Sequence, residues 1–227
     1  WLGRMIRNDK TSIEVDLAPK SNSKEIVNVI AAIDEEGKVE GKIRAQYFDY
    51  NAYGFREIHL KTSKDKYLEE MEKRYGGVEV GEYTTTNDND LSKPIIETFS
   101  FVNNNLADRI GNKIYFSPML HYARHENPFK DEVREFPVDF MFPYQDKYSY
   151  TITIPKGYEV ESMPEPIAIY MESNIGSFKY NIIKTANQVQ VTTILDMNYS
   201  NIPPDYYHTL RDFYKKMLEK QNEKVVL

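Results

Sequence analysis

Apolar and polar residues alternate with a period of two through much of this chain. The pattern is most informative between residues 126 and 164, where prolines interrupt it. Alternation of this kind places one set of side chains on each face of an extended strand. Because proline cannot donate a ladder hydrogen bond, it favours strand ends. The stretch therefore predicts an antiparallel β protein, and its two apolar sets are Val138, Phe140 and Phe142, then Tyr148, Tyr150, Ile152 and Ile154.

The same pattern predicts strands on both sides of this stretch. Residues 38–47 give the cleanest example, because apolar residues and glycine alternate there with charged or polar ones after a turn sequence at residues 34–37. An apolar run follows the polar loop at Ser21, over residues 25–33. Further strands are expected at residues 13–17, 78–86, 95–102, 113–116, 167–171, 178–182, 189–197 and 225–227.

Two segments have helical periodicity. Ser63 is placed to cap a helix, and Gly76-Gly77 supplies the left-handed stop after it. A second helix is expected after Pro203-Pro204-Asp205, because proline suits the first turn of a helix. Residues 51–60 stay ambiguous between helix and strand. The apolar stripes are Tyr67, Leu68, Met71 and Tyr75 in the first helix, and Tyr206, Tyr207, Leu210, Phe213, Tyr214, Met217 and Leu218 in the second.

These elements predict a mainly β fold with antiparallel, sandwich-like sheets and two helices packed on them. A chain of 227 residues has room for one large or two modest domains. We expect a leader or linker at residues 1–10, a β-rich subdomain with one helix at 11–125, and a β-meander subdomain with the C-terminal helix at 126–227. One continuous domain over 11–227 is the alternative.

Composition excludes several classes of function. The chain has no cysteine, which excludes disulfides, thiolate metal sites and cysteine nucleophiles. The 29 basic and 35 acidic residues are interspersed, so no basic patch favours nucleic acid. No apolar run approaches the ~18 residues of a membrane span. No signal peptide is present, and the opening Trp1-Leu2-Gly3 suggests a piece of a longer protein.

The most suggestive site residues are His121 and His125, with Glu126 adjacent. On a helix, two histidines four residues apart lie on one face and can share a metal with a carboxylate. The metalloprotease pattern, however, needs a glutamate directly after the first histidine, and Tyr122 stands there. An ordinary loop or short helix is the better interpretation, so we expect no metal, no cofactor and no catalytic residue.

Other candidates have simpler explanations. The carboxylate pairs Glu35-Glu36 and Glu69-Glu70 lie in turn and helix-surface contexts, where solvated side chains are the rule. No Gly-x-Ser-x-Gly elbow or phosphate-binding loop occurs. The 18 tyrosines and 11 phenylalanines could form a stacking platform for a ligand, but at two-residue spacing in strands they belong more often to a core.

Several segments resemble a known family. The run NPFK…E…FPVDF…Y…TIPKGYEVESMP and the ending PPDYYHTLRDFYKKMLEKQNEKVVL resemble a C-terminal domain of unknown function. This domain is found downstream of the transglutaminase-like, papain-fold core in secreted proteins of Bacteroides-type bacteria. The earlier segment EEGKVEGKIRAQYFDYNAYGFRE is also similar, through a Tyr-x-Ala-x-x-x-Arg element at Tyr50, Ala52 and Arg56.

The resemblance implies a secreted or periplasmic multidomain protein whose core carries a Cys-His-Asp triad. This chain has no cysteine, so no triad residue is carried over. We therefore expect a non-catalytic accessory or structural module that partners an upstream transglutaminase-like domain of the same polypeptide. A carbohydrate- or peptide-binding module, with a protein or glycan ligand, is the alternative, and a carboxylate- or metal-dependent hydrolase is a third. Neither nucleic acid nor a membrane span is expected.

Overall fold

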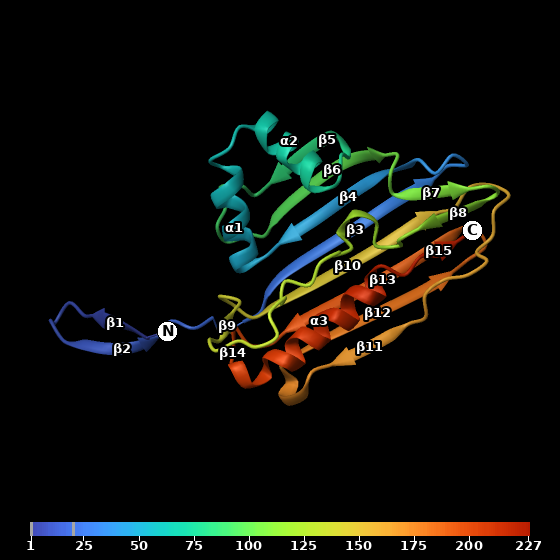
Figure 1. Ribbon diagram of the computed structural model, residues 1–227. Helices are drawn as coiled ribbons and strands as arrows, with labels where there is room; N and C mark the ends of the chain where they lie inside the picture. The colour runs from blue at the N-terminus through green and yellow to red at the C-terminus, as the bar shows by residue number, and fades with distance from the viewer. Residues whose placement is uncertain (1, 20) are drawn as a thin grey trace.

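The structure is a computed structural model that describes residues 2–19 and 21–227. Its centre is an eight-stranded sheet, whose long strands lie side by side in Figure 1. In spatial order the strands are β11 (Ile167–Tyr170), β12 (Gly176–Lys184), β13 (Gln188–Met197), β10 (Tyr144–Thr153), β3 (Ser23–Ile33), β4 (Val39–Tyr47), β6 (Ile95–Asn103) and β5 (Glu79–Thr86).

One parallel pairing joins the two halves of the chain in this sheet. β3 and β10 run parallel, from Ser23 opposite Tyr144 to Ala32 opposite Thr153, while the other neighbours in the sheet are antiparallel. The sheet is therefore continuous across residue 126. β10, which contains part of the alternating stretch at residues 126–164, is antiparallel to β13 on one side and parallel to β3 on the other.

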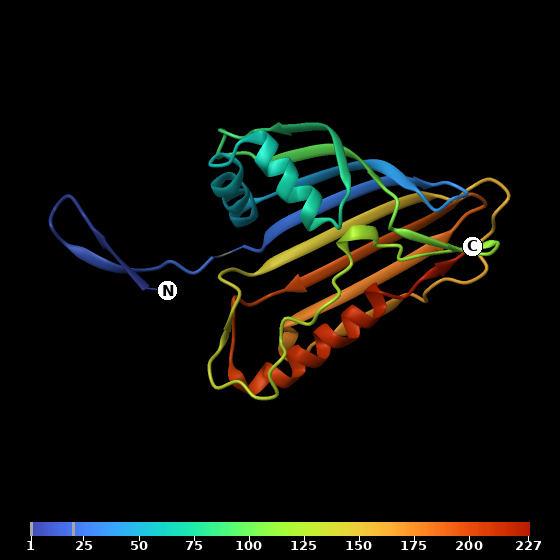
Figure 2. The ribbon, with the colours of Figure 1, turned by 45° about the horizontal axis from the view of Figure 1, so that its top comes forward.

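Helices and short strands cover one face of the sheet. The helices are α1 (Asp49–His59), α2 (Lys64–Arg74) and α3 (Tyr207–Gln221). Figure 2 shows all three on the same side of the large sheet. A three-stranded sheet of β15 (Val225–Val226), β8 (Lys113–Phe116) and β7 (Ala107–Ile110) lies on that side as well. The mainly β, sandwich-like fold with helices packed on sheets is confirmed, with α1 as a third helix in the ambiguous stretch.

The remaining elements are short. β9 (Val138–Asp139) pairs with β14 (Asn201–Ile202), and three 3-10 helices cover Leu120–Tyr122, Glu172–Asn174 and Pro204–Tyr206. β1 (Leu2–Ile6) and β2 (Ser12–Asp16) form a hairpin that projects from the body (Figure 1). Among the described residues no helix has the length and apolar character of a bilayer-crossing segment.

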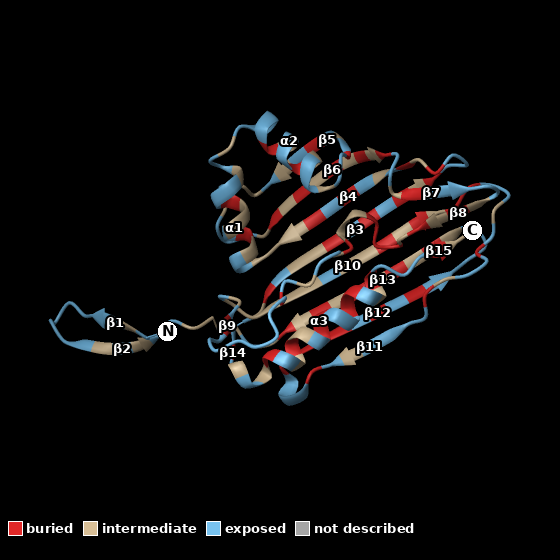
Figure 3. Cartoon of the chain, viewed as in Figure 1, coloured by how far each residue is buried: buried red, intermediate tan, exposed pale blue. Residues whose placement is uncertain are grey.

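The core lies between the covered face of the sheet and these helices. Buried and exposed residues alternate along the central strands, as Figure 3 shows. α3 buries its predicted stripe, including Leu210 and Met217, which are fully inaccessible to solvent. A helix of this kind is held mainly by burial of its apolar face and much less by helix propensity.

The strand predicted over residues 138–142 is wrong beyond Asp139, and the residues that follow line a pocket described below. The alternation over 138–142 predicts a strand, but β9 ends at Asp139. The carboxylate of Asp139 accepts a 2.7 Å hydrogen bond from the backbone N–H of Met141, whose φ is +66°. This local side-chain turn competes with strand pairing. It leaves Phe142 outside any strand, against α1.

Candidate functional site

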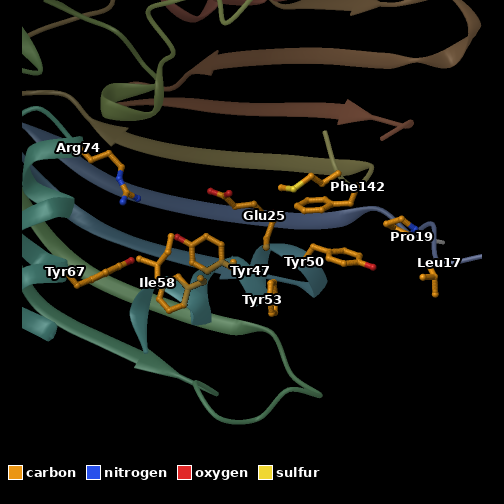
Figure 4. A pocket seen from close by; sticks show the side chains of 14 residues that line it. Leu17, Pro19, Glu25, Tyr47, Tyr50, Tyr53, Ile58, Tyr67, Arg74 and Phe142 are labelled. Carbon is orange, nitrogen blue, oxygen red and sulfur yellow. The ribbon is translucent and has the colours of Figure 1, made fainter. Parts of the chain in front are cut away.

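A pocket of about 470 Å³ lies between α1 and the sheet. We call it the α1 pocket. Residues from β3, β4, α1, α2 and the loop before β10 line it, and Figure 4 shows how their side chains surround the space. Its size falls in the range of small-molecule sites in proteins. The lining residues are Leu17, Pro19, Glu25, Tyr47, Tyr50, Asn51, Tyr53, Gly54, Phe55, Ile58, Tyr67, Arg74, Met141 and Phe142.

Stacked aromatic pairs form the walls of the α1 pocket. The rings of Tyr47 and Phe55 lie 5.0 Å apart at 25°, and those of Tyr50 and Phe142 lie 5.0 Å apart at 13°. Tyr53, 62% exposed, stands at the rim. Flat aromatic walls of this kind offer apolar area with few conformational degrees of freedom.

The start of α1 is fixed to the floor of the pocket. Ser23 on β3 is fully buried, and its hydroxyl donates to the Phe48 carbonyl at 2.9 Å. The same hydroxyl accepts from the Asn51 N–H at 3.0 Å. Unpaired N–H groups at a helix start need such acceptors. The contact therefore places the first turn of α1 directly beside β3.

Glu25 supplies the one carboxyl group among the residues that line the pocket. It lies on β3 between Tyr47 on β4 and Asp146 on β10, its partners in the sheet register. Its Oε1 accepts a 3.3 Å hydrogen bond from the Tyr148 hydroxyl. Burial, followed by the neighbouring charge of Asp146, raises the pKa of Glu25 well above its usual range.

Asp146 shares this polar region but points into a different space. Its carboxylate lies 3.5 Å from the guanidinium of Arg124. Burial raises the pKa of Asp146, and Arg124 opposes that shift. The small crevice of about 10 Å³ that Asp146 and Arg124 line is separate from the α1 pocket, so only Glu25 of the two carboxyls reaches the larger space.

Arg74 brings the opposite charge to the α1 pocket. It is the last residue of α2 and lines the pocket together with Tyr67. In Figure 4 the Glu25 carboxyl points toward the end of the pocket at which Arg74 and Tyr67 lie. Within the described part of the chain, neither Glu25 nor Arg74 forms an ion pair.

A buried carboxylate anchors the helical side of the pocket. Glu97 on β6 is 1% exposed. It accepts hydrogen bonds from the hydroxyls of Tyr47 at 2.9 Å, Tyr67 at 2.7 Å and Tyr83 at 3.0 Å. Burial and the nearby carboxylate raise the pKa of each of these tyrosines. The phenols stay protonated as donors, so this cluster ties β4, β5 and α2 to β6.

Arg56 anchors α1 from its other side. Its buried guanidinium donates to the backbone carbonyls of Asn87, Asp88, Asp90 and Lys93 at 2.8–3.1 Å. A planar guanidinium can satisfy several carbonyls at once. The predicted Tyr-x-Ala-x-x-x-Arg element is thus used in three ways, because Tyr50 lines the pocket, Ala52 packs in the interior and Arg56 holds a loop.

The two histidines of the candidate metal motif lie in different environments. The 3-10 helix that contains His121 ends at Tyr122, so the four-residue spacing does not bring the rings onto one helical face. His121 packs against Tyr75 and Phe101, with ring centroids 4.6 and 5.2 Å away. His125 is exposed, and its Nδ1 lies 2.7 Å from Asn222 Oδ1. The described residues contain no group of three or more His, Asp or Glu side chains arranged to hold a metal ion.

The other sequence candidates also lie apart from the pocket. Glu36 forms a 2.9 Å ion pair with Arg109, and Glu69 a 2.6 Å pair with Lys73 one helical turn away. The tyrosines are divided, since several fill the core and a few reach the pocket. Sequence reasoning missed Glu25 and Arg74, because nothing in their local spacing separates them from surface charges.

Comparison with known proteins shows the family. Residues 112–227, about half of the chain, match the family described as a domain of unknown function with a solved structure, DUF3858. The chain belongs to this family, which confirms the expected domain of unknown function at that level. The matched part contains Met141 and Phe142 of the α1 pocket and all of α3.

A solved structure adds a distant likeness. It is a "putative protease" from Parabacteroides distasonis, 16% identical, with a TM-score of 0.37. The similarity covers 42% of this chain and 19% of that one. No curated protein matches the chain.

Proposed function

We propose that this chain is a non-catalytic accessory module of a larger, secreted or periplasmic transglutaminase-like protein, and that it binds peptide ligands for that protein in the α1 pocket. The observation that carries the binding role is the pocket of about 470 Å³, whose described lining residues include stacked aromatic pairs and one charged group of each sign. A well-formed apolar pocket with a few convergent polar groups is the default ligand site of a protein. The sequence resemblance supports the multidomain setting.

The arrangement of the carboxyls supports binding over hydrolysis. A two-carboxylate hydrolase holds its groups on either side of the bond that it breaks. Glu25 and Asp146 instead lie side by side on neighbouring strands, and Asp146 lines a separate crevice with Arg124. Glu97 is occupied by three tyrosine hydroxyls. Glu97 and Asp146 hold and shape the fold around the pocket, and Glu25 is the carboxyl that lines it.

Binding can be tested by filling the pocket from Gly54. This residue lines the pocket on α1, and a Cβ built there meets no atom within 4 Å. The Gly54→Trp variant should therefore fold and place its indole in the pocket. Panels of peptides, amino acids and oligosaccharides are titrated against wild type, Gly54→Trp and the control Gly54→Ala, with NMR shifts as the readout. Ligands that bind wild type and Gly54→Ala, and bind Gly54→Trp at least ten-fold more weakly, support the proposal.

Two outcomes contradict the binding role. If no member of the panel binds wild type, or if Gly54→Trp binds as tightly as wild type, the α1 pocket is not the site. Binding of oligosaccharides alone would make the chain a carbohydrate module. The exposed Tyr170 on β11 supplies a second control, because Tyr170→Ala removes a surface ring that is outside the pocket lining.

The accessory role needs the longer polypeptide. Gly54→Trp, placed in the intact protein, should lower kcat/KM of the transglutaminase-like domain toward a peptide substrate, whereas Tyr170→Ala should not. Equal activity of wild type and Gly54→Trp on that substrate would contradict the role in substrate presentation.

A further inference from the structure

The α1 pocket holds a carboxyl group and a guanidinium group that are not paired with each other. Glu25 enters from β3 and Arg74 from the end of α2. Tyr148 gives the Glu25 carboxyl one hydrogen bond, to Oε1, and among the described residues no side chain donates to its Oε2. Arg74 has no hydrogen-bond partner there either. Both groups therefore keep binding capacity toward the pocket.

Glu25 is half-buried and Arg74 is exposed, and the pocket walls beside them are mostly apolar. Rings of Tyr47, Phe55, Tyr50 and Phe142 make up most of the walls, with Ile58 beside them. A ligand that fills such a space removes water from both charges. Desolvation of a charge is costly unless the ligand supplies a partner. A neutral ligand would satisfy neither group, and a ligand with one charge would satisfy one and be repelled by the other.

Asp146 and Arg124 act on Glu25 in opposite directions, because the charge of Asp146 raises the pKa of Glu25 and that of Arg124 lowers it. They form their own pair at 3.5 Å beside Tyr148, on the side of Glu25 away from the α1 pocket. The net charge of that neighbouring pair is zero. The described lining residues thus present one acid, Glu25, and one base, Arg74, toward the same end of the pocket in Figure 4.

We infer that the α1 pocket binds a zwitterion, a free amino acid or short peptide with an apolar side chain, with its ammonium on Glu25 and its carboxylate on Arg74. Arg suits the second contact because its guanidinium can donate two parallel hydrogen bonds to a carboxylate. The aromatic walls take the apolar side chain. The inference rests on the proposed binding function and specifies the class of ligand.

The test removes each charge from the ligand and from the protein in turn. Calorimetric titrations use L-phenylalanine, N-acetyl-phenylalanine, which lacks the ammonium, and phenylalanine amide, which lacks the carboxylate. Leucyl-phenylalanine has its ammonium and carboxylate farther apart than a free amino acid. Comparing its affinity with that of L-phenylalanine shows whether a peptide or a free amino acid fits the pocket better. The proteins are wild type, Glu25→Gln and Arg74→Gln, with Glu219→Gln and Arg44→Gln as matched controls at exposed positions without ion pairs. Urea unfolding verifies that each variant is folded.

The expected result is a thermodynamic cycle. Acetylation or amidation should weaken binding to wild type and to both controls at least ten-fold. In Glu25→Gln the effect of acetylation should disappear while the effect of amidation remains, and in Arg74→Gln the reverse should hold. If capped and uncapped ligands bind wild type equally, or if the two variants respond as the controls do, the zwitterion assignment is wrong.

Failure of this inference is distinguishable from failure of the proposed function. If none of the four compounds binds, but another peptide or a glycan of the panel binds and Gly54→Trp blocks it, only the ligand class is wrong. If no compound binds in a way that Gly54→Trp blocks, both are wrong.

Discussion

The hydroxyl of Tyr67 on α2 lies 2.7 Å from Oε1 of Glu97 on β6, deep between helix and sheet. Tyr83 donates to the same oxygen and Tyr47 to the other. Because Tyr47 and Tyr67 also line the α1 pocket, the carboxylate that organises the fold here also sets the shape of the site. Stability and binding therefore depend on the same cluster.

Replacing Glu97 by leucine should lower the free energy of unfolding by about 3 kcal/mol. The change leaves three buried hydroxyls without their acceptor, and an unsatisfied buried polar group costs ~1–3 kcal/mol. Urea unfolding followed by circular dichroism measures the loss. Tyr83→Phe is the matched control, because it removes a single donor and should cost about 1 kcal/mol. A Glu97→Leu protein as stable as wild type would contradict the anchoring role.

Arg56→Lys should lower the free energy of unfolding by about 2–3 kcal/mol. The lysine keeps the charge but cannot reproduce a fork that reaches four backbone carbonyls, so partly buried acceptors in residues 87–93 lose partners. Amide exchange at residues 87–93 should also quicken. The exposed Arg44 supplies the comparison, because Arg44→Lys should change stability by less than about 0.5 kcal/mol.

Much of the fold could be predicted from the sequence, because the alternation with period two is the direct result of one buried sheet face. β4 covers Val39–Tyr47 against the predicted 38–47, and α3 buries the predicted stripe from Tyr207 to Leu218. The helix at Asp49–His59 could not be predicted in the same way. Only Ala52 and Arg56 are buried there, so its sequence has no broad apolar stripe, and tertiary contacts hold it.

The candidate site was beyond prediction for a different reason. Glu25 and Arg74 are far apart in the chain and meet at one pocket only through the sheet register and the position of α2. Phe142 reaches α1 because Asp139 turns the chain at Met141. Conversely, the close spacing of His121 and His125 suggested a site, but the short helix that contains His121 ends at Tyr122, before His125. Spacing in sequence predicts contacts within one element, whereas sites form between elements.

Gly54→Ala should raise the free energy of unfolding by up to about 1 kcal/mol. Gly54 lies inside α1, where alanine is favoured over glycine by ~1 kcal/mol, and its Cβ would meet open space. Gly41 on β4 is the contrasting case, since a Cβ there would clash with the Ile30 carbonyl oxygen. Thermal unfolding should show Gly54→Ala above and Gly41→Ala well below wild type. If Gly41→Ala were instead more stable than wild type, the expected clash between its Cβ and the Ile30 carbonyl would be contradicted.

The buried imidazole of His121 should make the protein sensitive to acid. Both ring nitrogens are buried without a hydrogen-bond partner among the described residues, and the ring lies against Tyr75, Phe101 and Tyr122. Burial lowers the pKa of His121 from 6.5 to about 4. Between these values the unfolded chain binds more protons than the folded one, so stability falls as the pH drops from 6.5 toward 4.

Replacing His121 by phenylalanine isolates this contribution, because the variant keeps every other titrating group and fits an aromatic environment. Between pH 7.5 and pH 4, the free energy of unfolding of wild type should fall by about 3 kcal/mol more than that of His121→Phe, since each pKa unit corresponds to ~1.4 kcal/mol. Urea titrations of wild type and His121→Phe at both pH values give the four free energies of unfolding that the comparison needs. Parallel pH dependence in the two proteins would mean that the ring gains a partner on protonation. In that case the packing of His121 against Tyr75 would have to open in acid.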